Sequence, residues 1–348
     1  MAITLNQIAQ LCGVSRGTVD RALHNKGNVR PEVAARIKAV ATEHGYTPNR
    51  AGLALSRAAH PIRIGVVMIS VETPFMQMVL DSARREARRL SAFSVEVIFR
   101  LSQSLDPVEQ VSMIEELVEQ HHISALALTP LDCLLVETKL NELTEQRGIP
   151  IITFNTDLAN SRRLCYIGQD NLASGRTVAE LMRLVTRECG TVATIIAPFL
   201  YHSAYRERLA GFKEELLTPG SQLQLQEVTI PNDNRDVAYE HTLRLLRDTP
   251  NLTGIYAITP GYAGVCSALV DSGRAHEVHL IMHDEIPANL HEIRRGVADF
   301  VIGQDAQLQG SLPLSLLADH IQLNQRPQKE FYHTDIRVLL RHNIDNLL

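Results

Sequence analysis

The spacing of apolar residues changes near residue 61 and divides the chain into two parts. Before that point, apolar residues recur at helical spacing, with Ile8, Ala9 and Leu11 on one face of a first segment. After it, residues 62–69 are almost continuously apolar and rich in β-branched side chains, as expected of a strand buried on both faces. We therefore expect a small helical head followed by an α/β body.

Residues 4–24 predict two short helices joined by a tight turn. Gly13 lies where the chain must reverse, which requires a small residue or a positive φ. Thr4 and Gln7 fit a capping box, and Ser15 is placed to cap the second helix. A third helix is predicted over 31–44. Such a bihelical unit buries its apolar seam and presents the outer face of its second helix, as a recognition helix does in a DNA major groove.

Charge agrees with a DNA-binding role for the head. Residues 1–60 carry eight Lys and Arg against three acidic residues, a net charge of +5. The whole chain has a net charge of −5, so residues 61–348 carry −10. A basic head on an acidic body indicates that the head alone meets a polyanion. The alternative is a small helical packing domain with incidental surface charge.

The head resembles the DNA-binding region of the lactose-repressor (LacI/GalR) family of transcription factors. The motifs that carry the resemblance are Ile8-Ala9, Gly13-Val14-Ser15, the run 18–23, Val29 and the run 46–51. The DNA-contacting residues that we expect are Leu5, Ser15, Arg16, Gly17, Thr18, Asp20, Arg21, Asn28, Asn49 and Leu55. The resemblance also implies a hinge helix that folds on DNA, pairs with its twin and inserts Leu55 into the minor groove to kink the duplex. An ordinary interdomain linker is the alternative for this segment.

Two positions of the head depart from the family. Asp20 stands where the family usually has Ser, and His24 stands where it usually has Asn. We expect Asp20 to accept from a cytosine amino group or to orient Arg16 or Arg21 rather than to approach a phosphate. Gly17 occupies a position that usually helps to choose the operator in this family, so more of the base discrimination should fall on Arg16.

From residue 61 onward, strand and helix patterns alternate. The predicted strands are 62–69, 94–99, 125–128, 150–154, 192–196, 224–228, 254–258 and 280–282. The predicted helices are 75–90, 107–121, 131–147, 171–187, 203–217, 234–248 and 261–273. Repeated strand–helix units predict parallel sheets covered by helices on both faces. The body has more residues than one hydrophobic core usually supports. We therefore expect two doubly wound α/β lobes in a periplasmic-binding-protein-like arrangement.

These patterns give a domain prediction. We expect a helix-turn-helix DNA-binding domain over 1–48, a hinge helix or linker over 49–60, an effector-binding and dimerisation domain over 61–340, and a tail over 341–348. Within the body, the N-lobe should comprise about 61–165 with 304–328, and the C-lobe about 166–303 with 329–340. The strand near 166–168 is predicted to cross between the lobes, and the chain should return near 303–304.

Ligands of doubly wound sheets bind at the carboxyl ends of the strands, and polar residues gather there, including the segment 201–206. The body resembles periplasmic sugar-binding proteins of the ribose-binding type, through the runs 73–75, 168–171, 205–212 and 303–305. The effector-binding residues that we expect are Ser70, Thr73, Phe75, Asn155, Asp157, Arg206, Thr259, Asp284 and Gln304. The resemblance implies that Phe75 stacks on a sugar ring, while Arg206 and Asp284 grip hydroxyls through charged hydrogen bonds.

The predicted pocket departs from the ribose binders at two strand ends. Asn155-Thr156 replaces their Asp-Arg pair, and Thr259-Pro260 replaces their Asn-Asp pair, which argues against ribose itself. Structural roles remain open for three of the candidates: Phe75 as a helix core residue, Arg206 as a surface charge and Asp284 as a turn former. The expected effector is a sugar, a polyol or a sugar derivative, and a non-sugar metabolite is the alternative.

Other chemistry is poorly supported by the sequence. His276, His279 and His283 straddle a predicted loop and strand, so they should not converge on a metal. An α/β enzyme with an added DNA-binding head would need a nucleophile and base at the strand ends, but no motif unites Ser70, Asp157 and His283. We therefore expect no catalytic activity, no cofactor and no metal.

Location and assembly follow from similar arguments. The five cysteines are scattered without a Cys-x-x-Cys pair, as in reduced cytosolic proteins. No signal-peptide pattern and no apolar run of membrane-spanning length is found, so we expect a cytoplasmic protein without a membrane partner. A C₂ homodimer matches an operator with two half-sites. The segment after Arg337 is too short for a tetramerising coiled coil.

Overall fold

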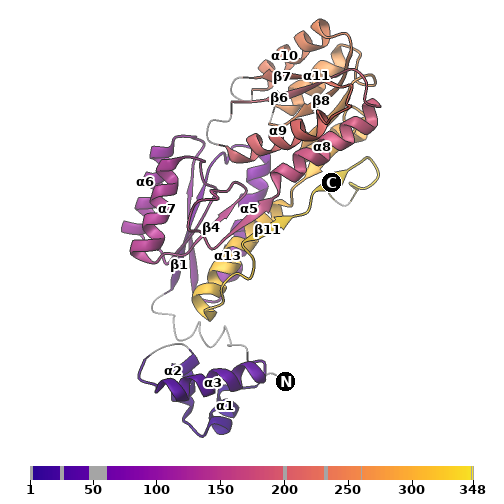
Figure 1. The fold of residues 1–348 in the computed structure, drawn as a ribbon. Coiled ribbons are helices and arrows are strands. Elements are labelled where there is room, and N and C mark those ends of the chain that lie inside the picture. Colours follow the sequence, from indigo (N-terminus) through magenta and orange to yellow (C-terminus); the bar gives the residue numbers. More distant parts are fainter. Residues whose placement is uncertain are drawn as a thin grey trace.

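The computed structural model describes residues 3–23, 27–46, 61–198, 202–230, 234–259, 261–345 and 347. Figure 1 shows a helical head and a body of two α/β lobes, which confirms the predicted fold class. The predicted hinge over 49–60, with Asn49 and Leu55, lies outside the described residues. None of the described helices is long and apolar enough to span a bilayer.

The head consists of α1 (Leu5–Cys12), α2 (Arg16–Leu23) and α3 (Pro31–Glu43). Both predicted caps form: Thr4 and Gln7 make a capping box on α1, and the Ser15 hydroxyl accepts the Thr18 N–H at 3.1 Å. Gly13 ends α1 with φ 59°, in the left-handed region that a glycine adopts without cost. The three helices bury one small apolar core, which fixes the outward face of α2.

The first lobe is built on a parallel sheet in the order β11-β5-β4-β3-β1-β2. Its strands are β1 (Ile62–Met68), β2 (Val95–Leu101), β3 (Ala125–Leu128), β4 (Ile151–Phe154), β5 (Cys165–Gln169) and β11 (Phe331–Thr334). Its helices are α5 (Pro74–Ser91), α6 (Pro107–Glu119), α7 (Leu134–Arg147) and α13 (Ala306–Leu323). The apolar side chains of α5 and α13 pack on one face of the sheet, and those of α6 and α7 pack on the other.

The second lobe has the sheet order β12-β10-β9-β8-β6-β7, parallel except for β12 against β10. Its strands are β6 (Thr191–Ile196), β7 (Gln224–Thr229), β8 (Leu252–Ala257), β9 (His279–His283), β10 (Phe300–Gly303) and β12 (Arg337–Leu339). Its helices are α8 (Asn171–Thr186), α9 (Ser203–Leu216), α10 (Arg235–Asp248), α11 (Tyr262–Asp271) and α12 (Pro287–Arg295). Helices α8 and α9 cover one face, and α10, α11 and α12 cover the other.

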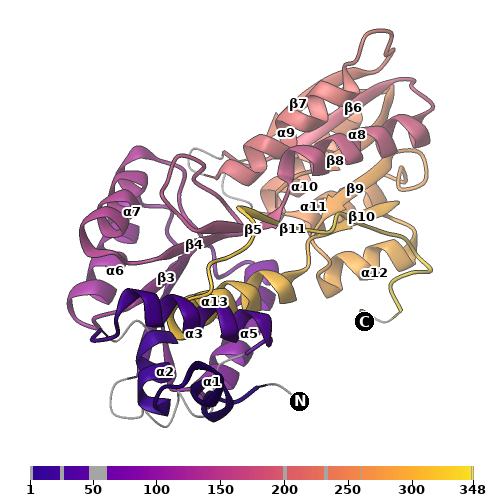
Figure 2. The ribbon, with the colours of Figure 1, turned by 60° about the horizontal axis from the view of Figure 1, so that its bottom comes forward.

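The chain passes between the lobes at three places, which lie together in Figure 2. The predicted crossing at 166–168 differs from the structure, because β5 is hydrogen-bonded to β4 and β11 and so belongs to the first sheet. The chain crosses after Gln169, Gly303 and Thr334, and the second of these is the return that was predicted near 303–304. The first sheet therefore includes 166–169 and 331–334, which were predicted to lie in the C-lobe.

Candidate effector cleft and DNA-reading helix

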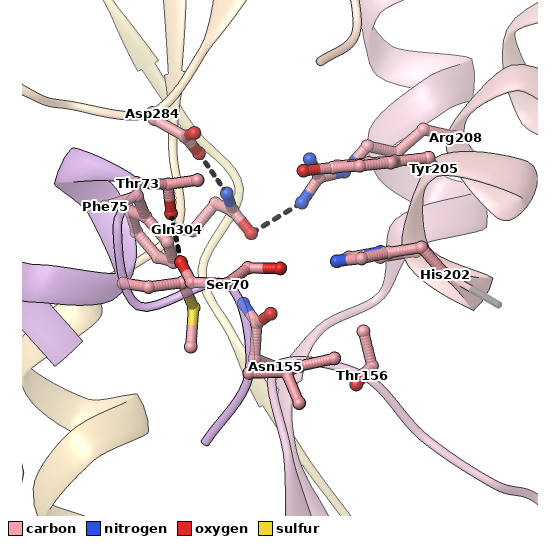
Figure 3. Close-up of a pocket in the computed structure, with 13 residues that line it drawn as sticks. Ser70, Thr73, Phe75, Asn155, Thr156, His202, Tyr205, Arg208, Asp284 and Gln304 are labelled. Carbon is pink, nitrogen blue, oxygen red and sulfur yellow. Dashed lines mark hydrogen bonds between the residues drawn. The ribbon is translucent and has the colours of Figure 1, made fainter. Parts of the chain in front are cut away.

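The carboxyl ends of strands from both lobes meet around one small cavity (Figure 3). Its walls are formed by Ile69, Ser70, Thr73, Phe75, Met76, Asn155, Thr156, His202, Ala204, Tyr205, Arg208, Asp284 and Gln304. The cavity encloses about 30 Å³, which is close to the volume of one water molecule in the liquid. The predicted residues Ser70, Thr73, Phe75, Asn155, Asp284 and Gln304 are thus brought together here.

Three of these residues share an unusual backbone conformation. Ser70, Asn155 and Asp284 have φ values of 54°, 65° and 73°, and they follow β1, β4 and β9. Asn and Asp tolerate this left-handed region better than other residues with a side chain, whereas Ser does so at some cost. The Thr73 hydroxyl donates to the Ser70 carbonyl oxygen at 2.9 Å and supports that turn. Such conformations are enriched at binding sites, where the surrounding fold holds them.

A chain of hydrogen bonds connects a buried cation to a buried carboxylate in the cavity wall. Arg208 is 3 % exposed, and its Nη2 donates to Oε1 of Gln304 at 2.5 Å. The Gln304 amide in turn donates to Oδ1 of Asp284, and the Tyr262 hydroxyl lies 3.4 Å from Oδ2. Burial raises the pKa of Asp284, while the Arg208 charge and these hydrogen bonds oppose that shift. The neutral amide therefore separates two charged groups that could each hydrogen-bond a ligand hydroxyl.

Two stacked aromatic rings form the opposite side of the cavity. The rings of His202 and Tyr205 lie 3.9 Å apart between centroids and within 5° of parallel. Burial lowers the pKa of His202 to about 3, with the Arg208 charge adding to the effect, so the imidazole is neutral at physiological pH. In Figure 3 the His202 ring points into the space facing Ser70. Both rings belong to the strand-end segment 201–206, but neither was in the predicted set.

The structure places Arg206 outside this cavity and puts Arg208 in the wall instead. Residues two apart on a helix do not share a face, so Arg208 lines this cavity while Arg206 lines a neighbouring pocket between the lobes. Arg206 is half-exposed and pairs with Asp132 of the first lobe at 2.5 Å. Arg208 lies on the buried face of α9 with Leu209 and Phe212. In the sequence, Arg208 occupies a position where the helical repeat of α9 otherwise has apolar residues. That pattern could have identified Arg208 as the arginine in the cavity wall.

Two more predicted residues lie away from the cavity. Asp157 accepts two hydrogen bonds from Arg163, each 2.6 Å long, and one from the Thr153 hydroxyl. Its carboxylate is thus engaged in holding the loop after β4. Thr259 is buried, and its hydroxyl accepts the N–H of Ala197 at 3.0 Å, which joins the ends of β8 and β6. Both side chains thus support strand ends, and Asp157 also lines a neighbouring pocket between the lobes together with Arg206.

The outward face of α2 carries exposed charge. Arg16, Gly17 and Arg21 are exposed, while Thr18 is half-buried and bonded to the Ser15 hydroxyl at 2.9 Å. Asp20 is also half-buried, and its charge contributes to the raised pKa of Tyr46, beside which it lies. Of the remaining predicted DNA-contacting residues in the described head, Leu5 packs partly into the core, and Asn28 is exposed with φ 56°.

These features define the class of protein: a two-lobed small-molecule-binding body that follows a helix-turn-helix head. Comparison with known families agrees. The family model of bacterial regulatory proteins of the lacI family matches residues 4–49, and that of a periplasmic binding protein domain matches residues 64–325. The chain belongs to the periplasmic binding protein domain family over residues 64–325, carries a lacI-family head as its motifs predicted, and is a ligand-responsive, DNA-binding transcriptional regulator.

Named relatives and solved structures are consistent with this assignment. The chain is 25 % identical to the HTH-type transcriptional regulator CelR of Thermobifida fusca over 328 residues, which cover 91 % of this chain and 92 % of CelR. It is 24 % identical over 288 residues to the ribose operon repressor of Halalkalibacterium halodurans, covering 82 % and 78 %. A solute-binding protein of Burkholderia graminis in complex with D-arabinose has a TM-score of 0.73 at 26 % identity, covering 82 % of this chain and 96 % of that one.

Proposed function

We propose that the chain is a homodimeric repressor whose DNA affinity is switched by a small sugar-like effector bound in the cleft. The observation that carries the proposal is the convergence of polar groups from both lobes on one buried cavity, in a chain with a LacI head. Two copies related by C₂ symmetry would present two heads to the half-sites of a pseudo-palindromic operator. Because a repressor must reach the operator on the chromosome, we place the protein in the cytoplasm.

Recognition of DNA is assigned to α2. Arg16 and Arg21 are exposed on this helix, and a guanidinium can donate two hydrogen bonds to the O6 and N7 atoms of guanine. The Arg16→Ala variant should lose about 1–3 kcal/mol of specific binding energy and discriminate less at one base pair of each half-site. Selection of bound duplexes from a random library would supply the operator, and fluorescence anisotropy would measure the loss.

Recognition of the effector is assigned to Arg208, Asp284 and Gln304. A ligand with adjacent hydroxyls can donate to the Asp284 carboxylate and accept from the Arg208 guanidinium, which replaces the bridging amide of Gln304. Ser70 and Asn155 face the same space from the first lobe, so a bound ligand would join the lobes. The effector can change the free energy of DNA binding only by the difference between its own binding free energies to the two arrangements of the lobes. Such coupling free energies are typically 1–3 kcal/mol.

A catalytic role is less well supported. The enzyme hypothesis needs Ser70, Asp157 and His283 to act together. Asp157 is held by Arg163, and His283 is buried with its Nε2 2.6 Å from the Tyr256 hydroxyl. Of the three, Ser70 alone lines the cleft cavity. We therefore assign binding without chemistry to this site.

The test is a thermal-shift screen of the full-length protein against neutral sugars, polyols and sugar phosphates. A ligand at 100 times its Kd should stabilise the folded state by about 2.7 kcal/mol. Arg208→Ala should abolish the shift, whereas Arg206→Ala, two residues away and outside the cavity, should retain it. The assignment is wrong if the two variants behave in the opposite way. No shift across the panel, with DNA binding intact, would remove sugars as the effector class.

A further inference from the structure

A second and much larger cavity adjoins the cleft cavity. It encloses about 990 Å³, at the upper end of the usual range for small-molecule sites. Its walls come from the start of α5 in the first lobe and from α10, α11 and α12 in the second. Thr73, Phe75 and Asp284 belong to the walls of both cavities. A ligand that contacts these three side chains can therefore extend from one cavity into the other.

The lining of this distal cavity combines aromatic rings with carboxylates. Tyr262 lies on α11 with its hydroxyl directed at Asp284, and the Tyr239 hydroxyl of α10 donates to Oδ2 of Asp271 at 2.9 Å. Phe75 adds a third ring from the first lobe. Aromatic faces cover the apolar side of a sugar ring, and carboxylates accept from its hydroxyls. The same combination is present in the cleft cavity, so the two cavities offer similar chemistry.

The charge of the lining selects against anionic ligands. Five acidic residues and two arginines line the distal cavity: Glu72, Asp236, Asp271, Asp284, Glu292, Arg235 and Arg295. Arg295 is already paired with Glu292 at 3.0 Å. A phosphate or carboxylate would meet an excess of negative charge in a partly enclosed space, where such repulsion is stronger than in open water.

We propose that the distal cavity binds a second sugar ring, so that the effector is a neutral disaccharide or longer oligosaccharide. This inference rests on the proposed function of the cleft as the effector site. The cleft cavity has room for about one water molecule in this arrangement of the lobes, whereas the distal cavity is already open. One ring would displace the Gln304 bridge, and the next would lie in the distal cavity, in whose wall Phe75 and Tyr262 are buried.

The chain contains no tryptophan, which allows a fluorescent reporter to be placed in the distal cavity alone. Ala263→Trp puts the reporter at an exposed position of α11 that lines this cavity. Leu184→Trp, at a residue of α8 that is 69 % exposed, is the matched control. Both proteins are titrated with glucose, galactose, arabinose, maltose, cellobiose, lactose, maltotriose and glucose 6-phosphate. Thermal shifts of the wild-type protein are measured with the same compounds.

We expect at least one disaccharide or trisaccharide to bind ten times more tightly than its component monosaccharides and to change the emission of Ala263→Trp but not of Leu184→Trp. A monosaccharide that binds equally well, with no change in emission, would overturn the inference while leaving the cleft as the effector site. If glucose 6-phosphate bound more tightly than every neutral sugar, the proposal that the effector is neutral would be wrong. No thermal shift with any compound would remove the proposed sugar effector, and this inference with it.

Discussion

His202 and His283 are buried with neutral imidazoles, and their burial links stability to pH. Burial lowers the pKa of His202 from 6.5 to about 3 and lowers that of His283 as well. Below pH 6.5 the unfolded chain binds protons that the folded chain excludes, so this contribution to stability is lost as pH falls from 6.5 toward 3. At pH 5.5 the loss relative to neutral pH should be about 1 kcal/mol per buried histidine.

His202→Phe tests this prediction because a phenyl ring can keep the stack on Tyr205 without a titrating group. The free energy of unfolding, measured by urea denaturation at pH 7.5 and pH 5.5, should fall less in the variant than in the wild type. His342→Phe changes an exposed histidine and serves as the control. An unchanged pH dependence in His202→Phe would show that this imidazole is solvated in the folded protein.

Some of the residues that line the cleft cavity could be located from the sequence, because the residue types at the strand ends gave a signal. Asn155 and Asp284 directly follow buried strands and are residue types that tolerate the left-handed conformation found there. The sequence did not distinguish Arg206 from Arg208, because the matching motif contains both arginines and does not state which one lines the small cavity. The helical repeat of α9 decides in favour of Arg208, one turn after the buried Ala204.

At the scale of elements, α8 and α9 are held together at two glycines. A Cβ atom on Gly211 would lie 2.1 Å from the Leu172 carbonyl oxygen, and one on Gly175 would lie 2.1 Å from that of Arg208. Backbone atoms cannot yield as a flexible side chain does, so the helices must separate if either glycine gains a side chain. Because Arg208 is one turn from Gly211, the separation would also move the cleft guanidinium.

Gly211→Ala should therefore lower the free energy of unfolding by about 1–3 kcal/mol and weaken effector binding. Gly17→Ala is a matched control in another helix, where the nearest atom, Ser15 Oγ, is 3.9 Å from the new Cβ. Its stability should be unchanged or higher by up to about 1 kcal/mol, because alanine favours the helix. Urea denaturation measures both variants. Equal stability of Gly211→Ala and the wild type would contradict the close packing of α8 on α9.

The alternation of strands and helices over 62–282 was predictable because most strands are short apolar runs and most helices are amphipathic. The crossings between lobes were harder to predict, because the sequence pattern of β5 would be the same in either sheet. Only its hydrogen-bonded pairing with β4 and β11 assigns it to the first sheet. Helix α13 was missed because Pro313 interrupts its interior and because apolar residues such as Leu312 and Leu316 also lie beside its buried row, which blurs the amphipathic pattern. Strands β11 and β12 are too short to show a period.

At the scale of the whole molecule, the charge separation between head and body predicts different salt responses for the two ligands. Operator binding should weaken steeply with salt, since a protein with 6–10 phosphate contacts loses roughly 10³–10⁵ in affinity between 50 and 200 mM. A neutral effector in a buried cleft releases no counterions, so its Kd should change less than about twofold. Anisotropy and calorimetry across this range measure both. If effector affinity fell with salt as steeply as operator affinity, the effector site would also be a binding site for a polyanion.

Coupling between the head and the cleft supplies a further prediction. If the effector changes operator affinity by a given factor, typically 5–150-fold, the operator must change effector affinity by the same factor. Calorimetric titration of the effector with and without saturating operator duplex measures the second factor, and anisotropy measures the first. Arg208→Ala should keep the operator affinity of the unliganded wild type but lose both changes, because it removes an effector contact and no DNA contact. If an effector bound the cleft and left operator affinity unchanged, the cleft and the head would not be coupled, and the proposed switch would be wrong.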